Sequence, residues 1–115
     1  MTQKLKTRPA PRVCNLYVIR LDRAVLGRRK FKEKNPQHDP RKPCVYVGMT
    51  HRTPEERFAQ HKRGYRASRY VKRYGQDLIP RQYARFNPMT RTEAGQLEVA
   101  LAERLRRRGY AVWQN

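Results

Sequence analysis

The sequence predicts an α+β domain with a small, mainly antiparallel three-stranded sheet flanked by helices, in the order strand, strand, helix, helix, strand, helix. Two stretches, NLYVIRL at 15–21 and CVYVG at 44–48, are rich in the β-branched and aromatic residues typical of strands. Two Thr-x-x-Glu capping boxes, at Thr53 and Thr90, each precede a segment with helical spacing of apolar residues. A chain of 115 residues fits one domain with a small core.

The N-terminal segment 1–12 is polar, basic and proline-containing. We expect a flexible arm here, either lying along a phosphate backbone or forming a plain disordered terminus. Residues 13–115 are expected to form the domain, with its first strand at 13–21. Residues 28–43, RRKFKEKNPQHDPRKP, contain three prolines, which makes a helix or a central strand improbable. This insertion is predicted to be a long basic loop, either a flap that contacts phosphate or a solvated insertion.

Helical structure is predicted after the second strand. Thr53 caps a helix that Gly64 ends or bends, and on it Arg57 lies four residues before His61, so both side chains should point near each other beside the core. A second short helix is expected to end at Gly75. The segment 78–88 is predicted to be the third strand, and the last six residues an extended segment packed on the domain.

The helix predicted after Thr90 places its glutamates in different environments. Its apolar stripe consists of Ala94, Leu97, Leu101 and Leu105. At about 100° per residue, Glu98 lies beside this stripe and Glu103 lies nearly opposite it. A carboxylate at the edge of the core needs a partner, which is either an arginine or a divalent cation. Placement alone favours the arginine, because ion pairs are the commoner solution.

The net charge of +19, from 28 Lys and Arg against 9 Asp and Glu, favours a polyanionic partner. Nucleic acid is favoured over an anionic membrane, because no helix with a wide, bulky apolar face is apparent. We expect basic residues in the insertion and near the end of the last helix to contact the phosphate backbone, without strong sequence specificity. They are Arg28, Arg29, Lys30, Lys32, Lys34, Arg41, Lys42, Arg104, Arg106, Arg107 and Arg108.

Two cysteines, Cys14 and Cys44, give no disulfide framework, and in an antiparallel strand pair they would lie at opposite ends. With no apolar leader and no stretch long enough to span a bilayer, the sequence predicts an intracellular protein, cytoplasmic or nucleoid-associated and not secreted.

The ordered set of motifs resembles the GIY-YIG endonuclease family. Tyr17 in NLYVIRL matches the first tyrosine of that family, with Asn15 and Leu16 in place of Gly and Ile, and YVG at 46–48 matches the second motif. Arg57 and His61 match the helical arginine and the His or Tyr four residues later. Glu98 matches the metal-binding glutamate. The resemblance covers about residue 13 to the end and favours a metal over an arginine at Glu98.

Two features depart from the family pattern. The separation between Tyr17 and Tyr46 is longer than in the family's compact hairpin, because the basic insertion lies between them. An asparagine usually follows the last helix closely, whereas Asn115 comes later.

The resemblance implies metal-dependent hydrolysis of a phosphodiester bond, with DNA favoured over RNA. One Mg²⁺ or Mn²⁺ on Glu98 would bind the scissile phosphate, and Arg57 would stabilise its growing negative charge. Tyr17 would activate the attacking water with help from His61, because a free phenol is a poor base at neutral pH. Tyr46 would orient the site. The alternative is a basic, non-catalytic nucleic-acid-binding module for structured RNA or a ribonucleoprotein, with both tyrosines as core residues.

Overall fold

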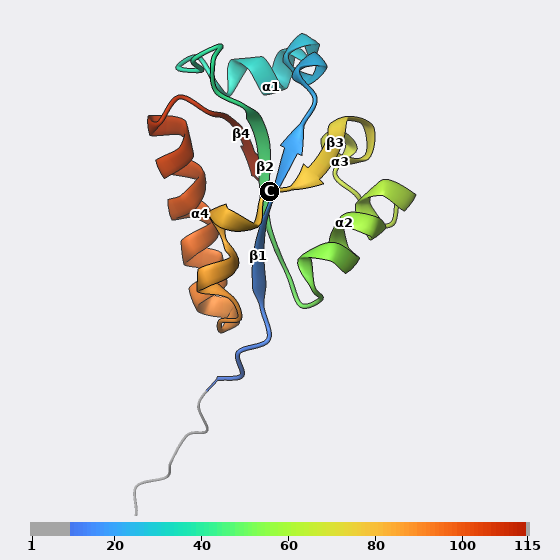
Figure 1. Cartoon of the computed structure of the whole chain (residues 1–115), viewed down its shortest axis with the longest axis vertical. Helices are drawn as coiled ribbons and strands as arrows, with labels where there is room; N and C mark the ends of the chain where they lie inside the picture. The colour runs from blue at the N-terminus through green and yellow to red at the C-terminus, as the bar shows by residue number, and fades with distance from the viewer. Residues whose placement is uncertain (1–9, 115) are drawn as a thin grey trace, which may run out of the picture.

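A computed structural model describes residues 10–114 of the chain as four strands, four α-helices and three 3₁₀ turns (Figure 1). The strands are β1 (Asn15–Leu21), β2 (Cys44–Thr50), β3 (Gly75–Leu78) and β4 (Ala111–Gln114). The helices are α1 (Arg29–Glu33), α2 (Pro54–Arg63), α3 (Arg69–Tyr74) and α4 (Arg91–Arg107), and the turns cover 23–27, 80–82 and 84–86. The predicted arm lies outside the described residues up to residue 9.

The sheet is four-stranded and mixed, with the order β3-β1-β2-β4. β1 pairs antiparallel with β2 and β3, whereas β4 runs parallel to β2. The α+β class is therefore confirmed. The prediction of three mainly antiparallel strands was wrong, because the sheet has a fourth strand, β4, at its edge, and this strand is parallel to its neighbour. The parallel pairing of β4 follows from α4. This helix carries the chain back along the sheet, so that the closing segment lies beside β2 and runs in the same direction.

The predicted third strand at 78–88 was placed too late. β3 ends at Leu78, and the residues after it form two 3₁₀ turns, the first beginning at Pro80. Proline has no N–H to donate to a ladder, so it suits a turn better than a strand interior. Beyond the end of β3, the side chain of Asn87 supplies hydrogen bonds to the backbone of β1. It accepts from the N–H of Leu16 and donates to the carbonyl of Leu16, both at 2.8 Å.

Helices cover both faces of the sheet, as Figure 1 shows with α4 on one side and α2 and α3 on the other. Tyr17 contacts His61 of α2, and Trp113 contacts Tyr70 of α3, so these strand residues share one face. The opposite face packs on α4. Side chains of both faces of β1 are buried from Leu16 to Ile19, which explains why that strand reads as a continuous apolar run.

The basic insertion is folded, so the prediction of a loop without a helix was wrong. Phe31 on α1 is fully buried and stacks on Trp113, with ring centroids 6.2 Å apart. Asn35 is 4% exposed and bonds to Phe31 and to both backbone groups of Val112. Burial of one aromatic side chain and one fully bonded amide outweighs the low helix propensity of a proline-rich segment.

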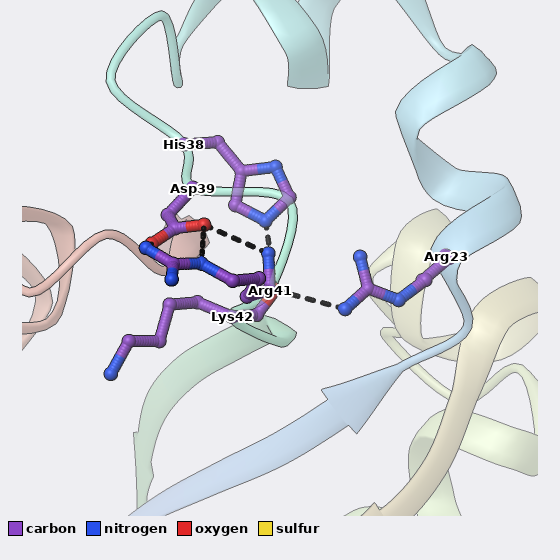
Figure 2. A network of polar contacts seen from close by, with 5 residues as sticks. All are labelled: Arg23, His38, Asp39, Arg41 and Lys42. Atoms are coloured by element: carbon purple, nitrogen blue, oxygen red, sulfur yellow. Dashed lines mark hydrogen bonds and ion pairs between the residues drawn. The ribbon is translucent and has the colours of Figure 1, made fainter.

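The second half of the insertion forms a polar network (Figure 2). Arg23 and His38 both contact the carbonyl of Lys42, at 3.3 and 2.9 Å, and Arg41 pairs with Asp39 through two bonds of 3.0 and 3.1 Å. The Arg41 guanidinium lowers the pKa of the Asp39 carboxyl to about 2. This part of the insertion therefore holds itself in place at the start of β2.

The helix boundaries follow the predicted caps. Thr53 and Thr90 each accept from the backbone of the glutamate three residues on and receive its side chain in return, so both capping boxes are confirmed. Gly64 ends α2 in the left-handed conformation at φ 89°. Cys14 and Cys44 are free, buried and at opposite ends of the β1–β2 pair, as predicted. Across residues 10–114, no helix has the length and apolar character to cross a bilayer.

Candidate functional site

The centre of the candidate site is a hydrogen bond between two buried side chains from distant parts of the sequence. Tyr17 Oη on β1 lies 2.8 Å from His61 Nε2 on α2. Tyr17 is 1% exposed and His61 is fully buried. The fold brings them together because the antiparallel β1–β2 pair is followed directly by α2, whose capping box fixes where its first turn lies.

The hydrogen bonds of His61 determine its tautomer. Nδ1 lies 3.1 Å from the backbone N–H of Ser68, and a backbone N–H can only donate. Burial and the nearby Arg57 charge lower the pKa of His61 to about 4, so the ring is neutral at pH 7. Its proton is therefore on Nε2, which donates to Tyr17 Oη. His61 cannot accept the Tyr17 proton in this arrangement; it helps only by stabilising negative charge on the phenol oxygen.

Tyr46 completes an aromatic cluster with these two residues. Its ring centroid lies 6.0 Å from that of Tyr17 and 5.4 Å from that of His61, the latter in an edge-to-face arrangement. Burial raises the pKa of both tyrosines. The Arg57 charge opposes this rise in both tyrosines, and Tyr17 also accepts the Nε2–H of His61, which stabilises negative charge on its oxygen.

Gly48 leaves the space that this cluster needs. It is the cross-strand partner of Tyr17, and a Cβ at Gly48 would lie 2.6 Å from both Cζ and Oη of the Tyr17 ring. A side chain at this position would push the phenol away from His61. The glycine of the YVG sequence therefore permits the close approach of a ring, a role more specific than ending a strand.

Arg57 lies at the partly exposed margin of the site. Its guanidinium donates to the side chain of Gln60 at 3.2 Å and to the carbonyls of Tyr65 and Arg66 at 3.1 and 2.7 Å. These bonds fix the guanidinium against the segment between α2 and α3. The same charge lowers the pKa of His61 and opposes the rise that burial causes in the pKa of Tyr17, so Arg57 acts electrostatically on the pair.

Glu98 on α4 is 8% exposed, and its partner is an amide rather than an arginine. Gln114 Nε2 on β4 donates to Glu98 Oε1 at 3.1 Å. Burial raises the pKa of Glu98, and the bond from Gln114 opposes the rise. The Glu98 carboxylate also raises the pKa of Tyr17 and Tyr46, which places it within electrostatic reach of both. Glu103 is exposed, as the helical spacing predicts.

Glu98 could supply one carboxylate ligand to a hard cation that has few other protein ligands. Within the described part of the chain, no group of three or more His, Cys, Asp or Glu side chains is placed to hold a metal. One carboxylate remains, held by a neutral amide that leaves its charge uncompensated. Mg²⁺ is commonly bound through one or two carboxylates with its other positions filled by water and phosphate oxygens.

The predicted nucleic-acid-contacting residues divide into two groups. Arg106 donates to the carbonyl of Val112 and to Asn35, and Arg41 is paired with Asp39, so these two have structural partners. Lys42 is half-buried with its ammonium over the Tyr110 ring. The remaining eight are exposed: Arg28, Arg29, Lys30, Lys32, Lys34, Arg104, Arg107 and Arg108.

Two residues that contribute to the site were not predicted from the sequence. Ser68 sets the His61 tautomer through its backbone N–H, which no side-chain pattern reveals. Gln114 reaches Glu98 only because β4 pairs in parallel with β2, and that pairing was not predicted. Asn115, the weakest sequence candidate, lies outside the described residues.

Of the five predicted residues, Tyr17, Tyr46 and His61 form one cluster on the face of the sheet that α2 and α3 cover, with the Arg57 charge acting on it. Glu98 lies on α4, which packs on the opposite face, and it acts on the two tyrosines through its charge. Comparisons with protein-family models, with curated proteins and with solved structures found no match for this chain. The class of protein is therefore argued from the site alone.

Proposed function

We propose that this protein is a divalent-metal-dependent endonuclease that hydrolyses phosphodiester bonds, with DNA favoured over RNA and with little sequence specificity. The observation that carries the proposal is the Tyr17–His61 hydrogen bond of 2.8 Å, with the Tyr46 ring packed against it and the charges of Arg57 and Glu98 acting on Tyr17. A domain that only bound nucleic acid would need exposed lysines and arginines and would gain nothing from a buried phenol with this set of neighbours.

The neighbours of Tyr17 suit it to proton transfer. A phenolate at Tyr17 would receive the Nε2–H of His61 and would lie near the Tyr46 hydroxyl and the Arg57 cation. These groups all stabilise negative charge on Tyr17 Oη, so together they oppose the rise in pKa that burial causes. Tyr17 would then take a proton from the water that attacks phosphorus, and Tyr46 would orient this oxygen.

Arg57 and Glu98 would act on the phosphate. Arg57 is fixed by three bonds and is partly exposed, so its charge can face the oxygens that gain negative charge. Glu98 would hold one Mg²⁺ or Mn²⁺, which when bound supplies positive charge to the phosphate and the leaving oxygen. Gln114 would keep the Glu98 carboxylate in one orientation.

A non-catalytic nucleic-acid-binding module is the second candidate. The near-complete burial of Tyr17, Tyr46 and His61 favours it, because a reacting phosphate and water need access to them. The net charge of +19 suits either function. Only a catalytic measurement separates the two candidates.

The test is cleavage of labelled branched, flapped, single-stranded and duplex DNA, with an RNA control, in Mg²⁺, Mn²⁺ or EDTA. Glu98→Gln should lower the rate at least about 100-fold and leave binding intact, because it removes the metal ligand and little volume. Glu103→Gln is the matched control, since Glu103 is exposed on the same helix. If wild type and both variants bind equally and none of them cuts, the binding module is the correct function.

A further inference from the structure

A second feature of the surface is a groove of about 410 Å³ between the start of α1 and the start of α3. It is lined by Gly27, Arg28, Arg29, Lys30, Arg69 and Tyr70. The lining residues come from two segments about forty positions apart. Four of the six carry positive charge, and none is acidic.

Most of this charge is uncompensated. Arg29 lies 3.9 Å from Glu33, with both side chains largely exposed, so this pair is weak. Among residues 10–114, no ion pair involves Arg28, Lys30 or Arg69. Arg69 lies over the ring of Tyr70, 5.3 Å from its centroid, which orients the guanidinium without neutralising it.

A slightly larger groove elsewhere shows that arginines alone do not make such a site. This second groove, of about 470 Å³, is lined by Arg20, Arg23 and Arg41 but also by Asp22. Arg20 pairs with Asp77 at 3.2 Å, and Arg41 pairs with Asp39 at 3.0 Å. Two of its three arginines therefore have acidic partners, and an anion would have to compete with them. The groove at α1 and α3 has no such competitor in its lining.

The groove at α1 and α3 borders the candidate active site. Arg69 directly follows Ser68, whose N–H bonds to His61 Nδ1. Tyr70, at the base of the groove, packs against Trp113 with ring centroids 4.7 Å apart, and Trp113 pairs across the sheet with Tyr46. A chain bound in the groove would thus lie on the same face of the sheet as Tyr17 and Tyr46.

We propose that this groove binds the phosphodiester backbone of the nucleic acid on one side of the position where the bond is cut. Arg28, Lys30 and Arg69 are the residues that contact phosphate oxygens, and Arg69 is an addition to the residues that the sequence indicated. The ligand class rests on the proposed function, but the binding site does not require that the protein cuts. A lipid surface fits less well, because the lining offers no exposed bulky apolar side chain: Tyr70 is only 3% exposed.

The test compares two triple variants with equal loss of charge, one in the groove and one in the exposed segment from the 3₁₀ turns to the first residue of α4. Binding of the full chain to a labelled oligonucleotide is measured by fluorescence anisotropy in EDTA, across a series of salt concentrations. Thermal unfolding checks that both variants fold. The variants are R28Q/K30Q/R69Q and R81Q/R85Q/R91Q, and the three arginines of the control are exposed and lie outside the predicted phosphate-contacting residues.

The groove variant should bind about tenfold or more weakly at moderate salt, and the slope of log affinity against log salt should fall by roughly 2 to 3, since about one counterion is released per phosphate contact. The control variant should lose less than threefold. Equal losses would overturn the proposal, because they would indicate only a general field of positive charge. It would also be overturned if the groove variant kept wild-type DNA affinity and lost binding to phosphatidylserine vesicles.

The failure of this proposal is distinguishable from that of the proposed function. If the groove variant binds weakly and wild type cuts nothing in Mg²⁺ or Mn²⁺, the groove is correct and the nuclease is not. If wild type cuts and the groove variant binds as wild type does, the nuclease stands and the groove is wrong.

Discussion

The two polar regions of this molecule use their side chains in opposite ways. In the cluster of Tyr17, Tyr46 and His61, every side chain is almost completely buried and is bonded or packed against the others. In the groove at α1 and α3, exposed cations face solvent, and within the described chain Arg28 and Lys30 form no ion pair. The first region is specified by protein contacts, and the second is open to a ligand.

This difference indicates that the rate of the reaction and the affinity for nucleic acid depend on separate residues. A buried cluster can tune pKa values because its neighbours are fixed and water is excluded. A solvated row of cations cannot tune a proton transfer, but it can attract a polyanion at long range. Substitutions in the cluster should therefore change rate without changing binding, and substitutions in the groove should do the reverse.

Tyr17→Phe is the substitution with the largest expected effect after loss of Glu98. It removes only the hydroxyl, so cleavage should fall by about 100- to 10,000-fold, the usual contribution of general acid–base catalysis. DNA affinity in EDTA should stay within twofold, because the groove is untouched. The unfolding free energy should drop by about 1–3 kcal/mol, since the Nε2–H of His61 loses its buried acceptor.

Single-turnover kinetics and urea unfolding measure the two effects of Tyr17→Phe. Tyr65→Phe is the control, because Tyr65 is 53% exposed and lies next to the same segment. A variant that cuts at the wild-type rate would show that the phenol only fills space, and the separation of chemistry from affinity would fail.

Acid should affect the cluster and leave the groove unchanged. Burial lowers the pKa of His61 from 6.5 to about 4, so the unfolded state binds a proton between these values and the folded state does not. The contribution of His61 to stability is present above pH 6.5 and is lost as pH falls toward 4, by about 3 kcal/mol in total. The guanidinium groups of the groove stay charged throughout.

The measurement is the urea midpoint at pH 7 and at pH 4.5 for wild type and His61→Gln. The raised pKa of Glu98 acts in the opposite direction, and the comparison of the two proteins cancels it because both contain Glu98. Wild type should lose more stability than His61→Gln over this range. Equal losses would mean that His61 is no more protected from protonation than a surface histidine.

Packing also distinguishes the cluster from the surface. Gly48→Ala should destabilise the fold by about 1–3 kcal/mol, because the new Cβ would lie 2.6 Å from the Tyr17 ring. Gly95→Ala is the matched control on α4, where nothing lies within 4 Å, and it should stabilise the helix by up to about 1 kcal/mol. Thermal unfolding of both variants checks the signs. A neutral Gly48→Ala would show that Tyr17 can move without cost.

Local signals in the sequence predicted the helices better than the sheet. The capping boxes at Thr53 and Thr90 depend on residues three positions apart, so they can be read directly and are confirmed. The parallel pairing of β4 depends on where α4 delivers the chain, which no local pattern contains. α1 was not predicted for a similar reason. The burial of Phe31 in the tertiary structure stabilises this helix despite the nearby prolines.

The candidate site shows the same limit. Order along the chain indicated Tyr17, Tyr46, Arg57, His61 and Glu98, which lie on elements that the sequence predicted. It indicated neither the donor that sets the His61 tautomer nor the partner of Glu98, since both belong to segments placed by long-range packing. Arg69 was not predicted because its position beside residues 27–30 in one groove depends on the fold.

Gln114 lies on the strand that joins the two regions, and its substitution has the smallest expected effect. Its neighbour Trp113 packs on Tyr70 of the groove, and its own amide holds Glu98. Gln114→Ala should raise the pKa of Glu98 further and increase the Mn²⁺ concentration for half-maximal cleavage by about tenfold, the lower range for loss of an outer hydrogen bond to a metal ligand. The maximal rate at saturating metal should stay near wild type. Gln96→Ala, exposed on α4, is the control. An unchanged Mn²⁺ midpoint with weaker DNA binding would mean that β4 supports the groove and not the carboxylate.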